Sequence, residues 1–139
     1  MNASSNDPAW RPETHALGVA EMDATHEEFL RELGRLRRAD DADFPRLFDA
    51  FREHLRAHFD NESRLMRSCG FPPIAIHEAE HRRVLDEVAA LAGGAARGDL
   101  AAARAFLAAP VLDWFHNHLA TMDWALAACI KARGGGRQV

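Results

Sequence analysis

The sequence predicts an all-α protein, an up-down-up-down four-helix bundle in one domain. Three observations lead to this fold class. Ala, Leu, Glu and Arg dominate the chain, and two-residue alternation of apolar and polar residues is absent, which favours helices over strands. Proline and glycine divide the chain into four long segments, and each segment has one apolar stripe at helical spacing. Four such helices joined by short turns pack most simply as an up-down-up-down bundle.

The first two helices follow from their caps and apolar stripes. We expect the first helix to start at Asp23, as its N-cap, and to run to about Arg38. The stretch 39–43 supplies a turn and a new cap, and Pro45 lies in the first turn of the second helix, where a missing N–H costs least; this helix runs to Gly70. The stripe of the first helix contains His26, Phe29, Leu30 and Leu33. The stripe of the second contains Phe44, Leu47, Phe48, Phe51, Leu55, His58, Phe59, Glu62, Leu65 and Met66.

The third and fourth helices are bounded in the same way. The prolines at 72–73 open the third helix, which should end at the glycine pair 93–94. Asp99 can cap the fourth, which runs to about Arg133, and Pro110 should kink or divide it. The third stripe contains Ile74, His77, His81, Val84, Leu85, Val88 and Leu91. The fourth contains Val111, Trp114, Phe115, His118, Met122 and Leu126.

Composition describes an ordinary globular protein. With 47% hydrophobic and 27% charged residues, a packed core is expected, and 139 residues suit a single domain over 1–139. We expect a bundle core over about 22–133, an N-terminal arm over 1–21 and a flexible tail over 134–139. The 17 Lys and Arg residues against 21 Asp and Glu give a net charge of −4 without a dense basic stretch. We therefore expect no nucleic-acid binding.

The cellular compartment and the state of the two cysteines are predicted from motifs that the sequence does not contain. The first ten residues are polar, and no run of 18 apolar residues occurs, so we expect no signal peptide and no membrane insertion. These features predict a cytoplasmic protein. Cys69 and Cys129 lack C-x-x-C spacing and are expected to be free thiols, with a redox or disulfide role as the alternative.

Histidine is the unusual residue of this chain, with eight copies. Three of them belong to the background: His15 precedes the first helix, His116 points about 200° away from His118, and His54 lies at the edge of a stripe. The other five lie on core-facing stripes: His26, His58, His77, His81 and His118. Imidazoles in a core need partners, because burying a polar group alone is costly.

Spacing brings these inward side chains together as candidate metal ligands. His58 and Glu62 are four residues apart, as are His77 and His81, so each pair projects from one helix face. Either pair alone is also compatible with a solvated or hydrogen-bonded face, but the inward residues come from four successive helices, which favours a metal site. Five imidazoles and a carboxylate exceed one tetrahedral zinc, and no cysteine is near, so two first-row metals such as iron or manganese fit better.

The motifs resemble those of the hemerythrin family, in its single-domain bacterial form. The resemblance covers Trp10 to about Arg133. The matching motifs are Trp10 with Leu17-Gly18-Val19, Asp23-x-x-His26, His58-Phe59-x-x-Glu62 with Met66, His77-x-x-x-His81, and Trp114-x-x-x-His118-x-x-x-x-Asp123.

The resemblance implies a site for two iron ions. One iron would be bound by His77, His81 and His118, and the other by His26 and His58. Glu62 and Asp123 would bridge them, with an oxo or hydroxo group as a third bridge, and the second iron would keep an open position for O2. Asp123 rests on the resemblance, because five residues of α-helix place it about 140° around the axis from His118.

The implied function is reversible O2 binding for storage or delivery, without enzymatic turnover. Nitric oxide or azide-like anions are further ligands of such a site, and the protein partner is left open. One alternative is a regulatory module that senses O2, nitric oxide or iron. Another is a di-iron enzyme with peroxidase or nitric oxide-detoxifying activity.

Two phenylalanines are expected near the O2 pocket. Phe115 stands where the family usually has a Leu that lines this pocket, so its larger ring should narrow it, unless the ring is only a repacked core aromatic. Phe59, beside His58, is the second candidate.

Overall fold

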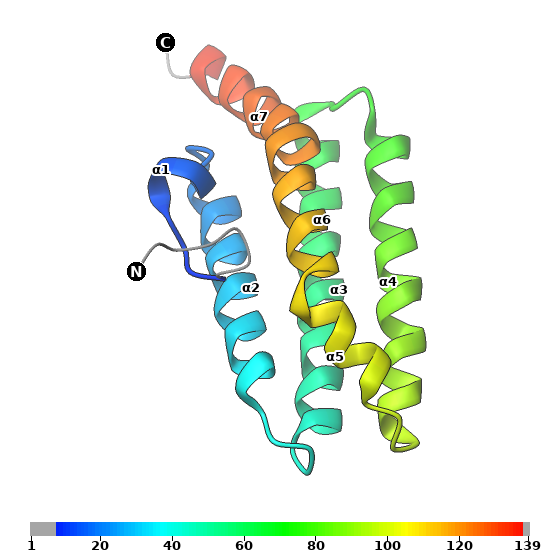
Figure 1. The fold of residues 1–139 in the computed structure, drawn as a ribbon. Helices are drawn as coiled ribbons and strands as arrows, with labels where there is room; N and C mark the ends of the chain where they lie inside the picture. The colour runs from blue at the N-terminus through cyan, green and yellow to red at the C-terminus, as the bar shows by residue number, and fades with distance from the viewer. Residues whose placement is uncertain (1–7, 138–139) are drawn as a thin grey trace.

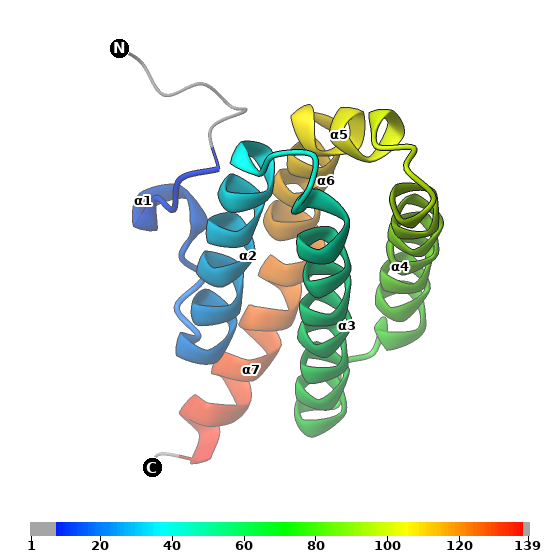
Figure 2. The same cartoon turned by 90° about the horizontal axis from the view of Figure 1, so that it is seen from below.

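The computed structural model describes residues 8–137, which form an antiparallel helical bundle. The three unbroken long helices are α2 (Ala20–Arg38), α3 (Phe44–Cys69) and α4 (Ile74–Ala96), and a short α1 (Pro12–His15) precedes them. The fourth arm consists of α5 (Ala101–Ala108), α6 (Pro110–His118), the π-helix η1 (Leu119–Asp123) and α7 (Trp124–Arg137). Neighbouring arms run in opposite directions (Figures 1 and 2). The predicted all-α up-down-up-down bundle is confirmed.

Glycines in left-handed conformation end α3 and α4. Gly70 has φ of +68°, and the N–H of Phe71 donates to the Met66 carbonyl at 2.9 Å, so α3 ends where predicted. Gly98 has φ of +94°, and the N–H of Asp99 donates to the Gly94 carbonyl at 2.9 Å. The predicted end of the third helix at the glycine pair 93–94 is therefore wrong by a few residues. Glycine lowers helix propensity there but leaves the backbone hydrogen bonds intact.

The predicted aspartate caps are also wrong. The helix α2 begins three residues before Asp23, whose carboxylate instead accepts the backbone N–H groups of Leu17 at 2.8 Å and Gly18 at 3.2 Å. Asp23 thus ties the N-terminal arm back onto the helix. At α5 the capping position belongs to Leu100, which makes no side-chain cap hydrogen bond, so Asp99 is not the cap.

The fourth arm is divided at Pro110, as predicted. The break falls between Ala108 and Pro110, because proline lacks the N–H that would continue α5. The arm's predicted end at Arg133 is wrong, since α7 continues as far as residue 137. Residues 134–137 of the expected tail are therefore helical, whereas 138–139 and residues 1–7 of the expected N-terminal arm lie outside the described residues.

The buried apolar residues form two clusters, one in each half of the bundle. The larger cluster includes Phe29 and Leu33 of α2, Phe51 of α3, and Val88 of α4. The smaller includes Met22 and Met66. Along α2 and α3, these clusters occupy helix turns on either side of His26 and Glu62. A layer of polar side chains therefore crosses the core between two apolar layers.

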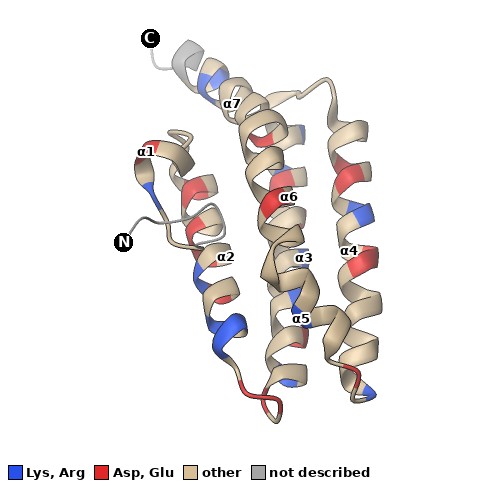
Figure 3. Cartoon of the chain, in the orientation of Figure 1, with Lys and Arg blue, Asp and Glu red and all other residues tan. Residues whose placement is uncertain are grey.

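Charged residues of both signs are interspersed along α2, α3 and α4 (Figure 3). Pairs such as Arg56 with Asp60 and Arg31 with Glu28 lie within single helices and are exposed to solvent, so each stabilises the fold only slightly. Among the described residues, no helix is both long and apolar enough to cross a membrane.

Candidate metal centre

Seven ionisable side chains meet in the polar layer of the core. They come from α2, α3, α4, α6 and η1, so every arm of the bundle contributes at least one. Six of them are at most 4% exposed, and His58 is 10% exposed. The seven are the residues predicted as ligands from the sequence: His26, His58, Glu62, His77, His81, His118 and Asp123.

Glu62 lies between two groups of histidines. Its Oε2 is 2.9 Å from His58 Nε2 and 3.2 Å from His26 Nε2. Its Oε1 is 3.2 Å from His81 Nε2 and 3.4 Å from His77 Nε2. One carboxylate therefore offers one oxygen to each group.

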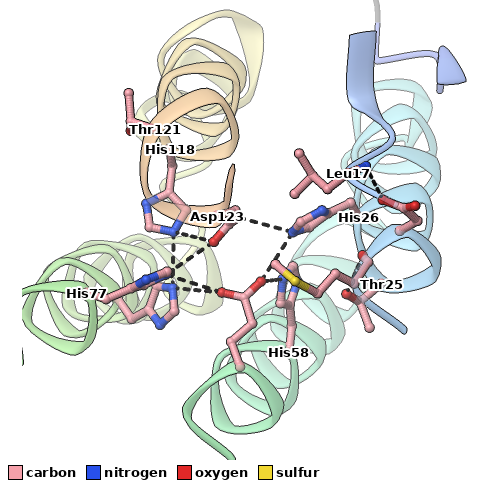
Figure 4. A network of polar contacts seen from close by, with 12 residues as sticks. Leu17, Thr25, His26, His58, His77, His118, Thr121 and Asp123 are labelled. Atoms are coloured by element: carbon pink, nitrogen blue, oxygen red, sulfur yellow. Dashed lines mark hydrogen bonds and ion pairs between the residues drawn. The ribbon is translucent and has the colours of Figure 1, made fainter. Parts of the chain in front are cut away.

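Asp123 repeats this arrangement from the opposite arm. Its Oδ2 is 3.1 Å from His26 Nε2, and its Oδ1 is 3.2 Å from the Nε2 atoms of both His77 and His118. In Figure 4, His77 and His118 lie on one side of Asp123 and His26 lies on the other. The two carboxylates thus link an α2–α3 group, His26 and His58, to a second group of three histidines.

The π-helix η1 explains how Asp123 reaches the centre. In an α-helix, Asp123 would point about 140° away from His118. The turn between them has hydrogen bonds from residue i to i+5, which places more residues in a turn and returns the fifth position toward the first. The result is the 3.2 Å contact between Asp123 and His118. Straight α-helical geometry predicts the wrong face here.

The donor atoms of this centre fit a pair of metal ions. All five imidazoles direct Nε2 toward the carboxylates, and the donor atoms of each group lie within 4.8 Å of one another. Among the described residues, His77 Nε2, Glu62 Oε1 and Asp123 Oδ1 are buried without a hydrogen-bond partner. Buried polar atoms are costly unless they are paired or coordinate a metal. Nitrogen and oxygen donors without thiolate suit first-row metals such as iron.

Electrostatics keep the two carboxylates ionised. Burial would raise the pKa of Glu62, but the charge of His58 and hydrogen bonds from His26 outweigh it and hold this pKa well below its usual value. Burial and the nearby charge of Glu62 would raise the pKa of Asp123, but its close contacts with the imidazoles of His118, His26 and His77 outweigh them and lower this pKa. Both shared carboxylates are therefore anionic near neutral pH.

The pKa values of the imidazoles in the same layer shift in different directions. Burial would lower the pKa of His26, but hydrogen bonds to Asp123 and Glu62 outweigh it and raise this pKa to about 9. Burial would also lower the pKa of His77, but its close contacts with Asp123 and Glu62 outweigh it and raise this pKa to about 9. That of His81 is lowered, chiefly by burial. A metal that binds His26 and His77 near neutral pH must displace their protons.

Two phenylalanine rings pack against the histidines of the centre. Phe115 is 2% exposed, its ring stacks on Phe29 at a centroid distance of 4.7 Å, and it lies nearly perpendicular to the ring of His26 at a centroid distance of 5.6 Å. Phe115 therefore lies on the side of the two-histidine group. Phe59 instead stacks flat on His81 at 3.8 Å, and its ring lies 5.5 Å from His58.

Trp114 is a neighbour of the centre whose role the sequence did not reveal. Its ring stacks on His118 at 4.7 Å, and its Nε1–H donates to Glu80 at 2.6 Å. The hydrogen bond fixes the indole, and the indole in turn fixes the imidazole plane. The only sequence signal was the four-residue spacing between Trp114 and His118, which places both on one helix face.

The three remaining histidines lie outside both groups. His54 is exposed and pairs with Glu32 across α2 and α3. His15 is buried, accepts the Arg11 backbone N–H at 2.8 Å through Nδ1, and stacks with His116 at 5.5 Å. His15 is thus a packed residue of the arm, although nothing in its sequence position predicted burial.

Both cysteines are free thiols, as predicted. The buried Cys69 has its pKa raised to about 11, first by burial and then by Cys129, whose thiol donates to the Cys69 carbonyl at 3.3 Å. They lie in and beside the smaller apolar cluster, and neither belongs to the two ligand groups.

The fold and this centre define a four-helix bundle protein of the metal-binding class, with two histidine groups joined by shared carboxylates. Comparisons with known proteins agree. The Hemerythrin HHE cation binding domain matches residues 17–129. A curated bacteriohemerythrin from Ralstonia nicotianae is 35% identical over 125 residues, which cover 90% of each chain. The chain therefore belongs to the hemerythrin family.

A solved structure shows the same fold. It is a crystal structure of hemerythrin carrying a leucine-to-alanine mutation, and it matches with a TM-score of 0.77 at 22% identity. The match covers 88% of this chain and 95% of that chain.

Proposed function

We propose that this protein binds O2 reversibly at a non-haem di-iron centre, for storage or delivery of oxygen. The observation that carries the proposal is the two-sided placement of Glu62 and Asp123, each with one oxygen toward each histidine group. A single metal would need only one of these groups. Two metals would use both, and membership of the hemerythrin family supports iron as the metal.

The two groups offer different numbers of donors. Three imidazoles, of His77, His81 and His118, and two carboxylate oxygens make five donors on one side. Two imidazoles, of His26 and His58, and two carboxylate oxygens make four on the other. For two metals of equal coordination number, the four-donor side keeps one more position free. We propose that O2 binds on this side.

The ligand set and the apolar surroundings of the centre favour reversible O2 binding over enzymatic turnover. Two iron ions held here would supply the electrons that reversible O2 binding requires. Five of the seven ligand residues are neutral imidazoles when metallated, so the centre holds few anions to stabilise high oxidation states. The apolar clusters on either side of the layer exclude water, and Phe115 covers the two-histidine side.

The test combines metal content with an oxygenation spectrum. Purified protein should contain two irons per chain, and anaerobically reduced protein should gain a visible absorption band in air and lose it under argon. His118→Ala should lose iron, whereas His116→Ala, a matched change two residues away on α6 and outside both ligand groups, should keep it. Finding zinc or one iron per chain would overturn the di-iron site. Immediate irreversible oxidation in air would overturn the carrier function.

Turnover assays separate the proposed carrier from an enzyme. Steady-state consumption of hydrogen peroxide or nitric oxide should stay near that of free iron in buffer. Sustained turnover that is lost in His118→Ala and retained in His116→Ala would replace the carrier with a di-iron enzyme.

A further inference from the structure

A groove between α2 and α3 leads toward the candidate metal centre. It has a volume of about 220 Å³. Its exposed wall is mostly apolar surface, contributed by side chains such as Phe29, Phe51 and Leu55, and polar residues such as Glu28, Glu32 and Asn61 also line it. Figure 2 shows α2 and α3 side by side along their length. His58, one of the two histidines of the four-donor side, lines the groove.

The exposure of the ligand residues agrees with this opening. His58 is 10% exposed, whereas the other six are at most 4% exposed. Phe29 lines the groove and stacks on Phe115, whose ring lies nearly perpendicular to that of His26. The groove therefore ends at His58 and at Phe29, and the ring of Phe29 is separated from His26 by Phe115. His58 and His26 are the two histidines of the four-donor side, which keeps one more coordination position free.

A second hollow serves as an internal comparison. It lies between α3 and α4, has a volume of about 240 Å³, and is lined by residues that include Phe59, Ser63 and His81. His81 belongs to the five-donor side, and the face of its ring is covered by Phe59 at 3.8 Å with an interplanar angle of 2°. The second hollow thus ends at His81, which Phe59 covers and which belongs to the five-donor side, where fewer coordination positions stay free.

We infer that the groove between α2 and α3 is the route by which O2 enters and leaves the four-donor side of the centre. The inference rests on the proposed function and adds the path to it. Apolar walls suit a small neutral molecule such as O2. The ion pair between Glu32 of α2 and His54 of α3 spans the groove, because both residues line it from opposite helices. This pair restricts the width of the entrance.

Blocking the groove should change rates without changing affinity. Ala57 is an exposed residue that lines the groove, and its side chain leans toward the preceding turn, where His54 lies. In Ala57→Phe, we expect the association and dissociation rates of O2 to fall together by roughly tenfold, within the range that variants of one site usually span. The equilibrium constant should stay unchanged, because a path affects entry and exit equally.

The control variant places a phenylalanine ring in the second hollow, between α3 and α4. Ser63→Phe, measured by the same stopped-flow method, should leave both rates as in wild type. Slower rates in Ser63→Phe with unchanged rates in Ala57→Phe would move the entrance to the α3–α4 side and overturn the inference. A changed equilibrium constant in Ala57→Phe without a matching change in both rates would also overturn it, since that is the signature of an altered site.

A variant that widens the entrance of the groove should change the O2 rates in the opposite direction. His54→Ala removes the pair with Glu32 from an exposed position, and both O2 rates should rise. Arg56→Ala, an exposed change on the same helix that does not line the groove, is its matched control. Unchanged rates in His54→Ala would show that the pair does not restrict entry.

Xenon provides a readout that does not depend on O2 binding. Crystals of the iron-loaded wild-type protein under xenon pressure should show xenon beside Phe29 and Leu55, and crystals of Ala57→Phe should not. Absence of xenon in the wild-type groove would overturn the route. The proposed function fails separately, if wild-type protein shows no reversible oxygenation at all, so the two failures are distinguishable.

Discussion

Replacing Phe115 by leucine tests whether its ring protects the proposed O2 site. Phe115 is 2% exposed and packs against Phe29 and His26 at centroid distances of 4.7 Å and 5.6 Å. In Phe115→Leu the ring is lost but the site stays apolar. The variant therefore enlarges the space next to the four-donor side of the centre while it leaves all seven ligand residues in place.

The size of the effect follows from these contacts. A large-to-small change at so buried a position should lower the free energy of unfolding by about 1–2 kcal/mol. For a chain of this length, that loss corresponds to a decrease in Tm of about 3–8 °C. An aromatic pair contributes about 0.5–1.5 kcal/mol beyond its buried area. If the contact with His26 protects the oxygenated form by that amount, autoxidation should accelerate roughly 2- to 13-fold.

The assay compares loss of the oxygenated absorption band over time in air with thermal unfolding. Phe48→Leu is the matched control, because Phe48 is fully buried, stacks on Phe44 and packs at a tilt against Phe51, away from the two groups of histidines. It should lose similar stability and keep the wild-type autoxidation rate. Equal autoxidation in wild type and Phe115→Leu would refute the reasoning and leave Phe115 as a packing residue.

Three further predictions follow from the same structure. Asp123→Ala removes one of the two shared carboxylates, so iron content measured by elemental analysis should fall below two per chain, and a full complement would contradict the bridging role. Because the folded-state pKa values of His26 and His77 are raised to about 9, the stability they contribute to metal-free protein is present below pH 6.5 and lost as pH rises through 9. Its Tm should therefore decrease from pH 7 to pH 10, and an increase would contradict this. Asp23→Ala leaves two backbone N–H groups of the arm without their acceptor and should cost about 1–2 kcal/mol by urea unfolding, whereas no loss would mean that water replaces the carboxylate.

Local sequence signals located most helix boundaries but misplaced several. Gly70 and Pro110 acted as predicted, because a left-handed glycine and a proline without an N–H both interrupt the backbone pattern directly. The glycine pair 93–94 only lowers helix propensity, and α4 passes through it to end at Ala96, two residues before the left-handed Gly98. Asp23 has a side chain that can cap a helix, but the packing of the N-terminal arm supplied other N–H groups for it to accept.

Periodicity alone placed five histidines and Glu62 in the core, because their helical spacing follows the apolar stripes. It also established the helical bundle, since those stripes must bury one face of each helix. Only the tertiary structure decided how the centre is divided. The arms of the bundle set which imidazole meets which carboxylate oxygen, giving five donors on one side and four on the other. The π turn of η1 brought in Asp123, which straight helical geometry would have pointed elsewhere, because hydrogen-bond register within a helix depends on the packing around it.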